Sequence, residues 1–89
     1  MKYEVFFEER AEKELAKIEK PFQRLIVTKI KQLAENFDSL ANNLKILKGK
    51  NDYYRLRVGN FRVIFYKDDA KIVITIVRIG HRKDIYERL

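Results

Sequence analysis

Apolar positions change their spacing along the first 38 residues. Residues 2–7 alternate roughly between apolar and charged side chains and include aromatic and β-branched types, which predicts a short strand. Residues 8–19 have acidic side chains in their first turn and apolar ones at helical spacing, which predicts a short amphipathic helix. Pro21, which suits the first turn of a helix, begins a longer apolar stripe that runs to about residue 38. Its members are Phe22, Leu25, Ile26, Ile30, Leu33, Ala34 and Phe37.

The second half of the chain has the two-residue alternation of strands. Residues 38–52 hold many Asn, Asp and Ser residues around the apolar residues Leu44, Ile46 and Leu47, which predicts a connection. Three strand patterns follow, at residues 53–58, 61–66 and 71–79. The Gly-Asn pair between the first two is typical of a two-residue hairpin turn, and the tail at 82–89 has room for a short helix.

This order of elements predicts an α+β fold in two layers. An N-terminal strand, a helix pair and a three-stranded antiparallel meander would form one domain over residues 1–89, with the first strand at an edge or in the centre of the sheet. Hydrophobic residues make up 46% of the chain, which is enough for a packed core. The chain has no cysteine and no apolar run of the roughly 18–20 residues that a membrane span needs. We therefore expect a cytoplasmic protein without disulfides.

Positive charge is concentrated in the second half. The chain has 20 Lys and Arg residues against 13 Asp and Glu residues, a net charge of +7. Residues 1–44 carry eight basic and eight acidic side chains, whereas residues 45–89 carry twelve basic and five acidic ones. A basic surface of this kind binds a phosphate backbone or an acidic protein, although a solvated surface is the more common meaning of additional lysines.

The predicted hairpin brings arginines together on one face. With a two-residue turn at 59–60, Arg57 lies directly opposite Arg62, where two like charges repel each other. An anion would relieve that repulsion, and a guanidinium group binds phosphate with two hydrogen bonds. The alternative is a solvated face whose arginines pair with Asp52 or Asp84. Alternation puts Tyr53, Arg55, Arg57, Arg62 and Tyr66 on this outer face and Tyr54, Leu56, Val58, Phe61, Val63 and Phe65 on the other.

A second group of polar residues follows the last predicted strand. Placed there, His81, Arg82 and Tyr86 can reach the edge of the arginine face. Histidine exchanges protons near neutral pH most readily, although a lone histidine such as His81 is more often structural. One histidine without cysteine cannot make a zinc site, and the three glycines are too isolated for a phosphate-binding loop. We therefore expect either phosphate chemistry without a metal or cofactor, or binding alone.

These segments resemble the RelE/ParE toxin superfamily. The resemblance rests on residues 47–49, 54–65 and 79–86, and the order of elements matches over essentially the whole chain. It implies a toxin of the RelE branch, which cuts messenger RNA in the ribosomal A site, with the ribosome, the mRNA and a RelB-like antitoxin as partners. Two alternatives are kept: a ParE-like inhibitor of DNA gyrase, and a noncatalytic module that binds RNA or the ribosome.

The resemblance also implies roles for single residues. Arg62 matches the hairpin arginine of the family and Arg82 its C-terminal arginine, and both stabilise charge on the scissile phosphate. Tyr86 matches a tyrosine that stacks on a base, although it lies closer to Arg82 than in the type toxin. Arg57 stands where well-studied members have lysine; because arginine does not lose its proton, His81 becomes the candidate for proton transfer.

The implied reaction is attack of a ribose 2′-hydroxyl on the adjacent phosphate, which leaves a cyclic phosphate and a free 5′-hydroxyl. This chemistry needs stabilisation of the phosphorane and transfer of protons, and it proceeds without a metal. The expected catalytic residues are Arg57, Arg62, His81, Arg82 and Tyr86, and the expected RNA-binding residues are Lys48, Lys50, Tyr53 and Arg55.

Overall fold

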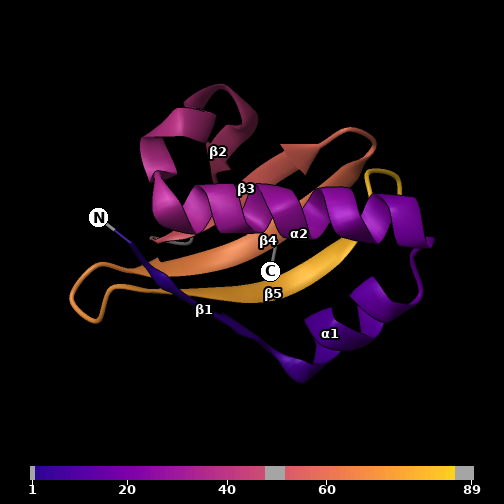
Figure 1. Ribbon diagram of the computed structural model, residues 1–89, viewed down its shortest axis with the longest axis horizontal. Helices are drawn as coiled ribbons and strands as arrows, with labels where there is room; N and C mark the ends of the chain where they lie inside the picture. The colour runs from indigo at the N-terminus through magenta and orange to yellow at the C-terminus, as the bar shows by residue number, and fades with distance from the viewer. Residues whose placement is uncertain (1, 48–51, 86–89) are drawn as a thin grey trace.

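The computed structural model describes residues 2–47 and 52–85, which form a five-stranded sheet with helices on one face (Figure 1). In chain order the elements are β1 (Glu4–Phe7), α1 (Glu9–Ala16), α2 (Lys20–Glu35), the 3₁₀ helix η1 (Phe37–Asn43), β2 (Leu44–Ile46), β3 (Tyr53–Val58), β4 (Phe61–Asp68) and β5 (Val73–His81). The predicted α+β fold with two layers is confirmed.

The sheet has the strand order β1-β5-β4-β3-β2. Strands β3, β4 and β5 form the predicted antiparallel meander, and β2 pairs antiparallel with β3. The first strand lies at an edge, where β1 pairs parallel with β5 and Glu4 stands opposite Val73. The helices α1 and α2, followed by η1, carry the chain across one face of the sheet from β1 at one edge to β2 at the other (Figure 1).

Several predicted boundaries were wrong. The stretch 38–52, predicted as a connection, contains most of η1 and the edge strand β2, whose three residues are too few for a recognisable alternation. Helix α1 ends at Ala16 and not at residue 19. Helix α2 ends at Glu35 and not near residue 38, and Phe37 begins η1. Strand β5 runs two residues later than predicted. Of the predicted tail helix, residues 82–84 form a turn, and 86–89 lie outside the described residues.

The main core lies between the helices and the sheet. The apolar stripe of α2 supplies Ile26, Ile30 and Leu33, all at most 2% exposed. They pack in one cluster with the inward side chains of the strands, among them Leu56, Val63, Phe65, Ile74 and Ile76. Burial of each such side chain contributes roughly 1.5–3 kcal/mol. No helix in the described part of the chain is long and apolar enough to cross a membrane.

A second, smaller apolar cluster lies on the outer face of the sheet. It consists of Leu47 after β2, Ile64 in the middle of β4 and Ile85 after β5, with Tyr53 packed against them. Ile64 is fully buried although it alternates with the arginines of this face. The prediction of a purely basic and aromatic outer face was therefore incomplete, because its centre is apolar.

Lys67 lies among aromatic rings at the end of β4 that leads into the β4–β5 turn. Its Nζ is 4.3 Å from the ring centre of Phe37 and 3.1 Å from a carboxylate oxygen of Asp69. The hydroxyl of Tyr3 donates a 2.6 Å hydrogen bond to Asp69, so the group ties β1 and η1 to the β4–β5 turn. Asp68, the last residue of β4, accepts a hydrogen bond from the backbone N–H of Lys71 in the same turn.

Candidate functional site

The β3–β4 hairpin has the register that its sequence predicts. Arg57 lies opposite Arg62 and Val58 opposite Phe61, so the turn consists of Gly59 and Asn60 alone. Gly59 has a φ of 58°, as the first central residue of a type II′ turn requires. The hairpin therefore fixes the two arginines side by side on the outer face.

The guanidinium group of Arg62 is held at the tip of this hairpin. Its Nη1 donates hydrogen bonds to the carbonyl oxygens of Gly59 at 3.1 Å and of Phe61 at 3.0 Å. Arg57 is exposed, and no described residue accepts a hydrogen bond from its side chain or forms an ion pair with it. Opposite residues in a sheet have Cβ atoms about 4.5–5.5 Å apart, so the hairpin brings two positively charged side chains close together here.

Arg82 lies beside this pair. It follows the last residue of β5 and begins the turn at 82–84, where its N–H donates a 2.7 Å hydrogen bond to the carbonyl of Asn60. Gly80 stands opposite Arg62, so alternation turns His81, the last residue of β5, to the helix side. The exposed Arg82 is thus held by its backbone against the hairpin that carries Arg57 and Arg62, and we call these three residues the arginine row.

A second row of the outer face lies further from the hairpin tip. It contains Arg55 of β3 and, opposite it on β2, Lys45. Lys45 was not predicted as part of this face, because β2 is not recognisable from the sequence. Arg78 of β5 lies opposite Ile64 of β4 in the same row, but its guanidinium is bound to Glu14 of α1. Arg55 and Lys45 thus share a row of the outer face with Arg78, whose guanidinium ties β5 to α1.

Tyr53 and Tyr66 form the third row, with ring centres 5.1 Å apart. Tyr53 also packs against the outer apolar cluster, so part of its ring surface is covered. The negative charge of Asp68 raises the pKa of the Tyr66 hydroxyl above its usual range. Of the other predicted residues, Lys48, Lys50 and Tyr86 lie outside the described residues.

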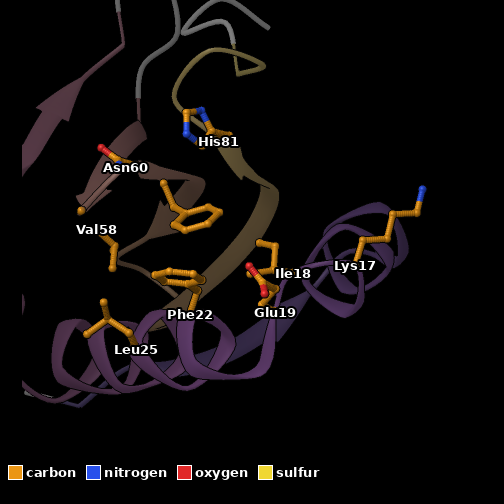
Figure 2. Close-up of a pocket in the computed structure, with 10 residues that line it drawn as sticks. Lys17, Ile18, Glu19, Phe22, Leu25, Val58, Asn60 and His81 are labelled. Carbon is orange, nitrogen blue, oxygen red and sulfur yellow. The ribbon is translucent and has the colours of Figure 1, made fainter.

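His81 lies on the other side of the sheet from the arginine row. Its ring packs edge-on against Phe61, with centres 5.9 Å apart, and its Nδ1 accepts a hydrogen bond from the backbone N–H of Lys83. His81 lines a groove of about 530 Å³. Figure 2 shows Phe22 and Leu25 pointing from α2 toward this groove. The expectation that His81 turns to the arginine face was wrong, because strand alternation continues through it.

Among the described residues, neither of the two carboxylates predicted to pair with the arginines of the outer face neutralises Arg57. Asp52 and Asp84 are both exposed, and neither makes an ion pair with Arg57 in the described part of the chain. The outer face is thus positive at the hairpin tip, apolar in its centre and aromatic at its far end. Such a surface fits an extended chain that carries phosphates and bases.

The chain is similar to known proteins in sequence and in fold. A family model described as the ParE toxin of the type II toxin-antitoxin system parDE matches residues 5–86. A putative RelE-like toxin protein of Escherichia coli is 32% identical over 97% of this chain and 92% of its own length. The chain belongs to the RelE-like toxins of type II toxin-antitoxin systems. The names ParE and RelE describe branches of the same superfamily, so this membership establishes the family and not the target of the toxin.

Solved structures resemble the RelE-like toxin over nearly its whole length. The archaeal RelE-RelB complex from Pyrococcus horikoshii contains a chain with a TM-score of 0.80 and 25% identity, covering 96% of this toxin and 100% of that chain. The RelB-RelE complex from Methanococcus jannaschii gives a TM-score of 0.72 and 32% identity, with 93% and 96% covered. The resemblance stated from the sequence is confirmed.

Proposed function

We propose that this toxin is a ribosome-dependent endoribonuclease that cuts messenger RNA and so stops translation in the cytoplasm. The observation that carries the proposal is the arginine row, in which Arg57 and Arg62 face each other and Arg82 lies beside them. Like charges opposite each other destabilise a sheet that has no ligand, and a phosphate would turn the repulsion into binding. The RelE names of its relatives support the same reading.

The proposed reaction needs positive charge where the phosphorane forms. The 2′-oxygen bonds to phosphorus, the bond from phosphorus to the 5′-oxygen breaks, and a cyclic phosphate and a 5′-hydroxyl remain. Arg62 and Arg82 bind the nonbridging oxygens, and Arg57 adds a third positive charge. Lys48, Lys50, Tyr53 and Arg55 hold the RNA, and Tyr86 stacks on a base.

Proton transfer follows a different route from the one first expected. Arginine stays protonated, and in its neutral form His81 carries its proton on Nε2 because Nδ1 already accepts the Lys83 N–H. Its ring also faces Phe61 and not the arginine row. We therefore assign the proton of the 2′-hydroxyl to solvent, and solvent also protonates the leaving 5′-oxygen.

The proposed partner is a RelB-like antitoxin. The solved relatives from Pyrococcus horikoshii and Methanococcus jannaschii are complexes of RelE with RelB. An acidic antitoxin segment complements the positive outer face, and it would neutralise the toxin by covering the arginine row. The exposed side chains of Phe22 and Leu25 offer an apolar surface on the opposite face.

The test is primer extension on a translated message in a cell-free translation extract. The wild-type chain should produce cuts only when ribosomes are present. Arg62→Ala should lower the cleavage rate by about 10²–10³. Arg24→Ala removes the same charge from an exposed position on α2 and should cut like the wild type. Equal cleavage by both variants would overturn the proposal.

The family model's description as ParE favours one second candidate, inhibition of DNA gyrase. A gyrase inhibitor would leave the message intact and block supercoiling by purified gyrase. Intact message together with unaffected gyrase would leave the remaining alternative, a module that binds RNA or the ribosome without cleaving it and loses affinity as salt rises.

A further inference from the structure

Gly80 is the point where the chain after β5 folds back onto the outer face. A Cβ atom at this position would lie 2.8 Å from Cδ1 and 2.9 Å from Cγ1 of Ile85. Ile85 is 7% exposed and belongs to the outer apolar cluster with Ile64. Gly80 does not have a positive φ, so its importance is the space it leaves for Ile85 and not its backbone conformation.

A tight turn connects these two residues and contains Arg82. The N–H groups of Asp84 and Ile85 both donate to the carbonyl of His81, at 2.8 and 3.1 Å. On the other side, the N–H of Arg82 donates to Asn60 in the hairpin turn. Arg82 is therefore held between the hairpin tip and the Ile85 contact, while its side chain remains exposed.

We propose that Gly80 and Ile85 are positioning residues that hold Arg82 next to Arg62 for the cleavage reaction. The proposal rests on the proposed function and adds a requirement to it. Gly80 stands directly opposite Arg62, so Ile85 lies on the arginine face at the level where the phosphate binds. A displacement of about 1 Å in a catalytic group lowers a rate by about 10². Loss of the Ile85 anchor should therefore act on catalysis through Arg82, without any contact of its own with RNA.

The kinetic test uses single-turnover cleavage of a defined short message on purified ribosomes. Ile85→Ala should lower kcat by about 10² and leave KM nearly unchanged, because the other basic residues still bind the RNA. Ile85→Val keeps the β-branched shape and should recover most of the rate. Ile46→Ala, an equal truncation at a residue that is 63% exposed, is the matched control and should cut normally. A fully active, folded Ile85→Ala variant overturns the proposal.

Trypsin provides a readout that does not depend on activity. Cleavage after Arg82 requires the turn to open, so both Ile85→Ala and Gly80→Ala should be cut there on the order of ten times faster than the wild type, while circular dichroism shows an intact fold. The double variant should be cut no faster than Ile85→Ala alone, because both changes remove one contact. Additive effects, or no change in cleavage, would overturn the anchor. If the wild type leaves the message intact, the proposed function fails, and the protease result still decides whether the anchor exists.

Discussion

Glu14 of α1 binds Arg78 of β5 across the edge that β1 leaves open. Its Oε2 lies 3.0 Å from Nη2 of Arg78, and Oε1 accepts a 2.9 Å hydrogen bond from the backbone N–H of Ile79. The last pair between β1 and β5 is Phe7 with Ile76, so this carboxylate occupies the place that a further strand residue would take. It satisfies a charged group and a backbone donor that are both largely buried.

Glu14→Ala should lower the free energy of unfolding by about 2 kcal/mol, because it leaves the N–H of Ile79 and the guanidinium of Arg78 without their acceptor. Glu9→Ala breaks the exposed pair of Glu9 with Lys13 and should change it by less than about 0.5 kcal/mol. Urea denaturation of the three proteins measures both differences. Equal stability of the two variants would show that the buried pair contributes no more than the exposed one.

Arg57→Gln should stabilise the ligand-free protein by about 0.5 kcal/mol at low salt, because it removes the repulsion from Arg62. Added inorganic phosphate should raise the Tm of the wild type more than that of the variant, since the wild type has the stronger anion site. Differential scanning calorimetry with and without phosphate measures both effects, with Arg24→Gln as the control for lost charge. A solvated, idle arginine face would give the same phosphate response in all three proteins.

His81→Asn should cleave RNA at nearly the wild-type rate and with the same dependence on pH. The asparagine oxygen can still accept the hydrogen bond from Lys83, so the turn that holds Arg82 is kept. The measurement is the single-turnover rate between pH 6 and pH 9. A loss of about 10²–10⁴ would restore His81 as the group that transfers the proton.

Stability should fall at alkaline pH through Tyr3 and Lys67. Burial lowers the pKa of Lys67. The hydrogen bond to Asp69 and the nearby Tyr54 and Tyr3 together raise it by more than burial lowers it, so that the pKa lies above its ordinary 10.5. The hydrogen bond to Asp69, followed by burial, raises the pKa of Tyr3 above 10.0. Both groups hold their protons more tightly when folded, so their contribution is complete below these values and is lost as pH rises through the folded pKa.

Thermal melts between pH 7 and pH 12 test this dependence. The Tm of the wild type should fall above pH 10, and Lys67→Met should show a smaller fall. Lys71→Met, at an exposed position in the same turn, should follow the wild type.

The pKa of Asp69 lies below its ordinary 3.8, chiefly through the hydrogen bond from Tyr3 and then the one from Lys67. Its contribution to stability is therefore lost only as the pH falls through the folded pKa.

The hairpin could be predicted because its information is local. Gly59 and Asn60 define the turn, and the turn alone sets which residue of β3 faces which residue of β4. The opposition of Arg57 and Arg62 followed from that register without any tertiary knowledge. The stripe of α2 was equally recognisable, since its period extends over several turns.

The missed features all depend on contacts between distant segments. Strand β2 has three residues and exists because β3 offers it an edge, so Lys45 could not be assigned to the outer face in advance. The burial of Ile64 results from Leu47 and Ile85, which approach it from opposite ends of the second half of the chain. His81 belongs to β5 because the strand ends two residues later than predicted, and strand propensity does not resolve a shift of this size.

The parallel pairing of β1 with β5 joins the first strand of the chain to the last. Strand β5 also provides Gly80, which stands opposite Arg62, and it leads directly to Arg82. Because this pairing joins segments far apart in the sequence, the sheet and the arginine row that depends on it can be completed only after β5 has reached β1, which makes their formation a late and slow step of folding.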